Sequence, residues 1–185
     1  SAVRHGLGLE FPGHAYEERL VLGDVAWDVD LPRDRLTTFL GDGFLACFPL
    51  EDGRWRLIGT CEADGPEVTL DELEAPVRRT GLPGELSDPR WLGRFRIHAR
   101  QVDRYRAGRV LLAGDAAHIH SPVGGQGMNT GIQDAHNLGW KLALVHRGAP
   151  DTLLDSYPTE RHPVATQILR ATNAASRLTL EGALE

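Results

Sequence analysis

The residues most able to do chemistry gather in a glycine-rich loop that follows a short apolar run. The run, residues 110–113, predicts a buried strand that ends at Gly114 and Asp115. Beyond Pro122, the glycines between residues 124 and 127 allow positive φ and let the backbone approach a flat ring closely. A carboxylate at the end of a strand can accept hydrogen bonds from ribose or polyol hydroxyls. Each residue alone also suits a simple turn, but together they predict a site for a polar, electron-rich ligand.

An amphipathic helix is expected directly after this loop, opened by Asn129 and Thr130. Thr130 and Gln133 fit a capping box, a pattern that marks the start of a helix. Two cationic residues followed by Gly148 predict its end. Its positive N-terminal end would stabilise negative charge at the loop by roughly 0.3–2 kcal/mol. The apolar residues expected to face the core are Ile132, Ala135, Leu138, Leu142 and Val145.

The wording of residues 124–143 resembles the second flavin-binding motif of the class A FAD-dependent aromatic monooxygenases. It reads Gly-Gly-Gln-Gly-Met-Asn-Thr-Gly-Ile-Gln-Asp-Ala-x-Asn-Leu-Gly-Trp-Lys-Leu-Ala, and the similarity begins at Arg109 and continues through residues 153–163. Within this para-hydroxybenzoate hydroxylase-like family, the aromatic polyketide hydroxylases and rifampicin monooxygenase are most similar. The chain departs from the family pattern at Ser121, where proline is more usual.

The resemblance implies a fragment of a larger flavoprotein. Residues 1–4 resemble the tail of the family's middle motif, and no Gly-x-Gly-x-x-Gly unit for the pyrophosphate occurs in the chain. The implied fold is mixed (α+β/α/β), with a β-sheet substrate domain followed by the C-terminal strand–loop–helix part of a truncated Rossmann-like FAD-binding domain. The expected parts are residues 1–4 (motif remnant), 5–100 (substrate-domain sheet), 101–150 (FAD-binding strand–loop–helix) and 151–185 (C-terminal helices, truncated).

The resemblance also assigns roles to residues of the loop. Asp115 would bind ribityl or ribose hydroxyls, and N–H groups around Gly127, Met128 and Asn129 would hold the flavin O2/N1 edge. The catalytic candidate is Pro122, whose carbonyl would lie near the flavin C4a atom and could receive a proton there. Arg4 would lie near the pyrophosphate and the NADPH path. The full set of cofactor-binding candidates is Gly114, Asp115, Pro122, Gly125, Gly127, Met128, Asn129 and Arg4.

The implied function is hydroxylation of an aromatic compound, either polyketide-like or phenolic. FAD would be the cofactor, NADPH or NADH the reductant and O2 the co-substrate, acting through a flavin C4a-hydroperoxide. Residues 1–185 alone are expected to be inactive. Two alternatives remain open: another flavoenzyme on the same scaffold, such as an epoxidase, halogenase or reductase, and a non-catalytic protein that binds an aromatic ligand.

The charge, apolar runs and cysteines of the chain indicate which partners and which compartment to expect. The formal net charge of −6 disfavours nucleic acid as a partner. No apolar run approaches the roughly 20 residues of a membrane helix, and we expect a cytoplasmic protein. Cys47 and Cys61 lack metal or redox spacing and are expected to be reduced. The series Asp115, His118, His120 resembles a metal cluster, but without a third strong ligand nearby no metal site is predicted.

Other aromatic and cationic residues favour structural roles. Trp91 and Trp140 are expected to be packing residues and not platforms on which a ring stacks. Arg94, Arg96 and Arg100 are expected on a solvated strand face, although one of them, or His98, could reach a phenolate.

The remaining pattern predicts a sheet first and helices last. A helix is expected over residues 69–80, a short helix capped by Asp151, and a continuation to about residue 177 that Pro158 and Pro163 break or kink. Hairpin turns are expected at residues 41–43 and 51–53. The expected strands are residues 19–27, 35–40, 43–49, 54–60 and 91–100.

Overall fold

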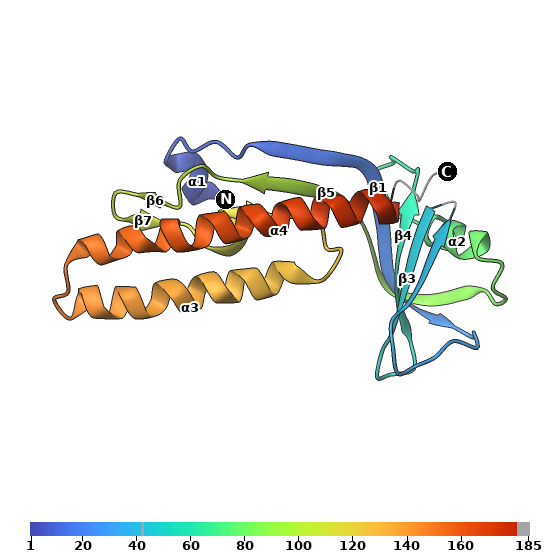
Figure 1. Cartoon of the computed structure of the whole chain (residues 1–185). Coiled ribbons are helices and arrows are strands. Elements are labelled where there is room, and N and C mark those ends of the chain that lie inside the picture. Colours follow the sequence, from blue (N-terminus) through green and yellow to red (C-terminus); the bar gives the residue numbers. More distant parts are fainter. Residues whose placement is uncertain (42, 181–185) are drawn as a thin grey trace. The chain divides into compact units, whose positions relative to one another are not determined.

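The computed structural model describes residues 1–41 and 43–180 (Figure 1). The chain forms two compact units. The first comprises Ser1–Ala15 and His98–Ser176, and the second comprises Tyr16–Ile97 together with the segment that begins at Arg177. The fold is a mixture of helices and an antiparallel sheet, as the sequence predicts.

The second unit is built on a sheet. The strands are β1 (Gly13–Trp27), β2 (Thr37–Gly41), β3 (Gly43–Pro49), β4 (Trp55–Cys61) and β5 (Leu86–Gln101), in the order β2-β3-β4-β1-β5. Antiparallel ladders join β2 to β3, β3 to β4, and β4 to β1. Each ladder sets the side chains of neighbouring strands opposite one another, alternating between the two faces of the sheet.

Helix α2 (Leu70–Arg79) covers one face of this sheet. It begins with a capping box, in which Thr69 and Glu72 each accept from the other's backbone N–H at 3.4 Å. Leu73 and Val77 on its inner side join Val21 and Leu57 of the sheet in one buried apolar cluster. The helix is thus fixed at its start by the cap and along its length by apolar burial.

Most elements predicted for this unit are confirmed. The strand 43–49 lies as predicted, and the helix predicted at 69–80 is α2 with Thr69 and Thr80 as its capping residues. The strand predicted at 19–27 is longer, because β1 already begins at Gly13, and the strand predicted at 91–100 begins at Leu86. The strands predicted at 35–40 and 54–60 lie one or two residues further along the chain. The turn predicted at 41–43 contains Asp42, which lies outside the described residues.

The first unit consists mainly of two long helices with short strands. Its elements are α1 (Ala2–Gly6), β6 (Arg106–Ala107), β7 (Val110–Leu111), a 3-10 turn η1 (Gly114–Ala116), β8 (His118–Ile119), α3 (Gln126–His146), a 3-10 turn η2 (Asp151–Asp155) and α4 (Ser156–Leu180). β8 pairs antiparallel with the end of β5, and β6 pairs with β7. Helices α3 and α4 lie side by side (Figure 1) and are joined by Lys141, which donates to Glu160 at 2.8 Å.

The predicted apolar face of α3 is confirmed only in part: Leu138 packs against the buried cluster that contains Tyr105 and Tyr157. Ile132 and Leu142 are exposed, whereas Thr130, Asp134 and Lys141 are buried. The reason is that α4 supplies charged partners for this side of α3, and a buried charge is stable only when it is paired. The apolar spacing shows that the helix is amphipathic but does not identify the side on which its partner packs.

The predicted start of α3 is wrong. The helix begins at Gln126, four residues before the expected N-cap, because Gly125 adopts a left-handed conformation (φ +64°) and acts as the N-cap. Thr130 lies inside the helix, where its hydroxyl donates to the Gln126 carbonyl at 2.7 Å. The capping box read at Thr130 and Gln133 is therefore not a cap.

Three smaller predictions for this unit need correction. The strand expected at 110–113 is only the two-residue β7. Asp151 lies in the first turn of η2 without capping it by a side-chain hydrogen bond. Helix α4 runs unbroken from Ser156 and includes both prolines. Pro158 is tolerated because the first turn of a helix needs no N–H donor.

Candidate functional site

A cavity of about 610 Å³ in the first unit opens at the glycine-rich loop. The loop between β8 and α3, together with the first turn of α3, forms most of its wall. Nine residues line it: Asp115, His118, Ile119, His120, Ser121, Pro122, Gly125, Gly127 and Met128. The cavity therefore lies where the sequence predicted a ligand.

The N-terminal end of α3 presents free N–H groups to this cavity. Gly125 donates its own N–H to the Pro122 carbonyl at 2.9 Å, which closes the loop. The next three N–H groups, those of residues 126–128, have no acceptor within the helix, and no side chain caps them. Such an end carries a partial positive charge and favours an anionic or electron-rich group. Met128 beside it is 76% exposed.

Asp115 supplies a carboxylate to the same cavity. It is exposed, and its side chain makes no hydrogen bond within the part of the chain that the structure describes. The turn that carries it depends on Gly114 (φ +55°), whose added Cβ would lie 3.6 Å from the Gly131 Cα atom. A free carboxylate and free N–H groups together complement a ligand that has hydroxyls at one place and an electron-rich edge at another.

Beneath this turn, Asp134 is the centre of a buried polar cluster. Its carboxylate is fully buried and accepts from three groups: the Gly114 N–H at 3.0 Å, His118 Nε2 at 2.7 Å and Arg161 Nε at 2.8 Å. The cluster thus connects α3, α4, β8 and the turn before Asp115. Because its partners are themselves buried or nearly so, the cluster fixes the position of the turn.

The charge of Asp134 is stabilised by its donors. Burial alone would raise the pKa of Asp134, but the hydrogen bonds from His118, Arg161 and the Gly114 N–H outweigh burial and lower that pKa. The carboxylate is therefore ionised at neutral pH and keeps Arg161 paired.

Histidine rings continue the cluster toward the cavity. The rings of His118 and His120 are nearly parallel, 7° apart in plane with centroids 6.4 Å apart. His118 also stacks on Tyr105. His120 Nδ1 lies 3.0 Å from the Ser121 carbonyl, which can only accept, so this nitrogen carries the proton. The histidines at the alternate positions 118 and 120 place both rings on one side, as the sequence suggested. The His118 ring, however, is already hydrogen-bonded to Asp134.

Arg4 approaches the same turn from the N-terminal segment. Its Nη1 donates to the Ala116 carbonyl at 3.2 Å, and its guanidinium lies 3.7 Å from the centre of the Phe11 ring. Arg4 is buried, and it does not line the cavity. This contact with Ala116 joins the N-terminal segment to the turn that carries Asp115. In the sequence, only the family resemblance connected these two segments.

The structure brings most of the predicted site residues together. Asp115, Pro122, Gly125, Gly127 and Met128 line the cavity. The other candidates, Gly114, Asn129 and Arg4, lie beside it in the supporting turn, in the first turn of α3 and against η1.

Sequence reasoning missed the supporting cluster of His118, Asp134 and Arg161. The available signal was Asp134, an acidic residue within the helix predicted after the loop that does not belong to the expected apolar face of that helix.

Interpretations of four other residues also change. Trp91 and Trp140, expected to be packing residues, are 42% and 46% exposed. Arg94 is not solvated, because it is held by Glu72 at 2.6 Å. Arg100 donates to the Phe11 carbonyl at 3.0 Å. Neither of these two arginines is therefore free for a phenolate.

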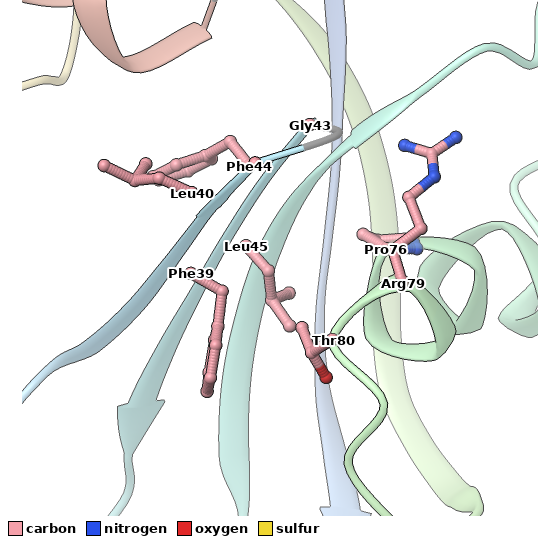
Figure 2. Close-up of a pocket in the computed structure, with 9 residues that line it drawn as sticks. Phe39, Leu40, Gly43, Phe44, Leu45, Pro76, Arg79 and Thr80 are labelled. Carbon is pink, nitrogen blue, oxygen red and sulfur yellow. The ribbon is translucent and has the colours of Figure 1, made fainter. Parts of the chain in front are cut away.

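A second hollow, of about 210 Å³, lies in the other unit between the β2–β3 hairpin and the end of α2 (Figure 2). Phe39, Leu45 and Pro76 make it largely apolar, and the Arg79 side chain extends away from Phe39 and Leu45. Arg79 is already paired with Glu62 at 3.2 Å. This hollow offers fewer groups for chemistry than the cavity at α3.

Comparison with known proteins identifies the class. The model of the FAD binding domain family matches residues 1–172, and the chain belongs to this family. The residues at the cavity fit a flavin, since a free carboxylate suits its hydroxyls and the uncapped end of α3 suits the edge of its ring that gains negative charge on reduction. The cofactor of this family is FAD, and these are the residues of the described chain that would hold it.

Individual relatives are aromatic monooxygenases. The chain is 46% identical to the "uncharacterized aromatic compound monooxygenase YhjG" of Bacillus subtilis over 96% of its length and 37% of that protein. It is 44% identical to rifampicin monooxygenase of Streptomyces venezuelae, over 96% of the chain and 39% of the relative. The structure of the OxyS anhydrotetracycline hydroxylase of Streptomyces rimosus is similar with a TM-score of 0.80 and 42% identity, over 96% of the chain and 37% of the hydroxylase. The chain thus spans well under half the length of these relatives.

No helix among residues 1–41 and 43–180 combines the length and apolarity needed to cross a membrane. Cys47 and Cys61 are free thiols. Burial raises the pKa of Cys47 to about 12, so this thiol is protonated and unreactive at neutral pH.

Proposed function

We propose that the chain is part of a flavin-dependent monooxygenase that hydroxylates an aromatic substrate, using NADPH or NADH and O2. The observation that carries the proposal is the cavity at which the free Asp115 carboxylate and the uncapped N-terminus of α3 meet. FAD bound there would supply the activation of O2 once it is reduced. The protein's own residues would bind it, orient it and stabilise its charge.

In this proposal Asp115 accepts hydrogen bonds from hydroxyls of the ribityl or ribose group. The N–H groups of Gly127 and Met128 hold the electron-rich edge of the ring. Because α3 begins at Gln126, the free N–H groups are those of residues 126–128, and Asn129 stands next to them in the first turn. Charge that develops at the ring edge is thereby stabilised by fixed dipoles.

Pro122 is the residue we assign to the reacting side of the ring. Its carbonyl already accepts the Gly125 N–H, and a carbonyl oxygen has a second lone pair. That second lone pair can accept a hydrogen bond from a proton-bearing group at the ring. The same hydrogen bond to Gly125 ties the position of this carbonyl to the start of α3, so the ring edge and the Pro122 oxygen are set by one loop.

The compartment is part of the proposal. Two free thiols within strand segments support a reducing environment, and we infer that the protein works in the cytoplasm, where NADPH is available.

The test uses the full-length protein that the relatives' length leads us to expect. Purified protein should carry FAD and should oxidise NADPH or NADH faster when an aromatic compound is added. Rifampicin, anhydrotetracycline and pentachlorophenol, the compounds named for relatives, form the first panel. Isotope-labelled O2 should place its label in the aromatic product. Protein without bound flavin, or flavin reduction without any labelled product across a broad aromatic panel, would count against the proposal.

A further inference from the structure

One buried carboxylate oxygen closes the turn that carries Asp115. Oδ2 of Asp134 accepts from the Gly114 N–H at 3.0 Å and lies 2.7 Å from His118 Nε2. Gly114 stands directly before Asp115 in the chain, and His118 stands three residues after it. A single atom of α3 therefore holds both ends of the segment 114–118, with the ligand-facing carboxylate between them.

The second oxygen of the same carboxylate connects this arrangement to α4. Oδ1 of Asp134 accepts from Arg161 Nε at 2.8 Å, and Arg161 Nη2 donates to the Thr130 carbonyl of α3 at 3.4 Å. The side chains of Asp134 and Arg161 are 0% and 10% exposed. Because a buried charge is stable only with its partner, the carboxylate cannot turn away without leaving the Arg161 charge unpaired.

Backbone contacts hold the middle of the segment as well. The Ala117 N–H donates to the Gly114 carbonyl at 2.8 Å, and the Ala116 carbonyl accepts from Arg4 at 3.2 Å. The Asp115 side chain, by contrast, is exposed and lines the cavity. The segment thus carries a ligand group on a backbone that is already held at several points.

We propose that Asp134 is a positioning residue for the cofactor, which holds the Asp115 carboxylate in the place where it binds the flavin hydroxyls. Asp134 does not line the cavity and acts through Gly114 and His118. A turn that is fixed beforehand needs no ordering when the ligand arrives, and this favours affinity. The inference rests on the proposed function, because it requires FAD in the cavity at α3.

The competing explanation is that the buried cluster only stabilises the fold. Removing the Asp134 carboxylate would then change FAD affinity by the same factor whether or not Asp115 is present. If Asp134 acts through Asp115, its effect disappears once the Asp115 carboxylate is gone. A double-mutant cycle separates the two explanations.

The experiment measures the Kd of FAD for the flavin-free, full-length protein by calorimetric titration. The four proteins of the cycle are the wild type, Asp134→Asn, Asp115→Ala and the double variant. Asp134→Asn keeps the side-chain volume but replaces one acceptor oxygen with an NH2 donor. Its matched control is Asp155→Asn, which removes the charge of an exposed carboxylate that does not line the cavity. Thermal unfolding confirms that each variant is folded at the temperature of the titration.

A second substitution at the other end of the segment repeats the cycle with less disturbance. His118→Phe removes the donor to Asp134 Oδ2 and leaves the ion pair of Asp134 with Arg161 in place. This variant takes the place of Asp134→Asn if the latter does not fold.

We expect Asp134→Asn to weaken FAD binding about fivefold or more, within the range for residues coupled through one hydrogen-bond network. In the Asp115→Ala background the same substitution should change the Kd less than about twofold, the limit for residues that act independently of one another. His118→Phe should follow the same pattern. Asp155→Asn should change the Kd less than about twofold in either background.

Two results would overturn the inference: equal weakening by Asp134→Asn in the two backgrounds, or an unchanged FAD affinity in Asp134→Asn alone. Both leave the proposed function intact as long as the wild type binds FAD and Asp115→Ala binds it more weakly. A full-length protein that binds no FAD refutes the proposed function itself, and the inference with it.

Discussion

Replacing Asp134 removes the buried carboxylate that joins α3 to α4 and to the turn before Asp115. Three donors lose their acceptor at once: the Gly114 N–H, His118 Nε2 and Arg161 Nε. Arg161 is the most costly of the three, because its side chain is only 10% exposed and its charge would lose its partner.

The size of the effect follows from this burial. Breaking a buried ion pair by removing one partner costs about 3–5 kcal/mol, and we expect Asp134→Ala to lower the free energy of unfolding by that amount. Asp134→Asn keeps the volume, but its amide nitrogen would face one of the donors, so we expect a loss of about 2–4 kcal/mol. Domains of this kind have total stabilities of about 5–15 kcal/mol, which leaves the asparagine variant folded and measurable.

Urea titration followed by tryptophan fluorescence measures this loss. The matched control is Asp155→Asn, because Asp155 pairs with Arg106 but is 66% exposed, and such surface pairs contribute at most about 1 kcal/mol. The pKa of Asp134 in the folded protein lies below its ordinary value of 3.8. The carboxylate therefore stabilises the fold above that pH, and its contribution is lost as the pH falls through the folded-state pKa. A loss in Asp134→Asn no larger than that in Asp155→Asn would refute the reasoning.

Further predictions concern the loop and the helix pair. A Cβ at Gly127 would lie 3.8 Å from His120 Cε1, so Gly127→Ala should fold, extend a methyl group into the cavity and raise the H2O2 released per NADPH consumed. Gly139→Ala, in open space of the same helix, is the control. Pro122→Ala should raise the same ratio with little change in substrate affinity, and an unchanged ratio would mean that the loop acts elsewhere. Hydrogen bonds from Asn137 and Lys141 lower the pKa of Glu160 to about 2, so Glu160→Gln should be less stable than the wild type near pH 6, because the buried ammonium group of Lys141 loses its charged partner. That difference should vanish near pH 2, because the carboxylate's stabilising contribution is lost as the pH falls through its folded-state pKa; a difference that persists there would contradict the assignment.

The local parts of the fold could be predicted from the sequence. The helix at residues 69–80 and the strand 43–49 are encoded by adjacent residues, so short windows identify them. The glycine-rich loop was also predicted, because its conformation depends on the glycines themselves.

The face and the start of α3 could not be read in this way. Asp134 and Lys141 are buried because Arg161 and Glu160 of α4 pair with them, and these partners lie 27 and 19 residues further along the chain. A helical periodicity carries no information about such a partner. The start at Gln126 depends on the left-handed backbone of Gly125, whereas the capping-box pattern four residues later was only an accidental match.

Residues that line the candidate site could be predicted from the sequence, but the buried cluster that supports them could not. The family resemblance indicated Asp115 and the loop, and the structure places both at one cavity. The buried cluster below them joins His118, Asp134 and Arg161 from three elements, and only the tertiary structure brings these together.

The most direct test of the account is FAD binding by Asp115→Ala in the full-length protein, measured by calorimetric titration of the flavin-free form. Asp115 is exposed, so its removal should leave the fold intact, and loss of hydrogen bonds to a charged acceptor should weaken FAD binding by about 1.5–3 kcal/mol, or roughly 10- to 150-fold. Weakening of this size with unchanged thermal stability is the predicted result. Unchanged FAD affinity in the variant would contradict the assignment of the cavity as the flavin site.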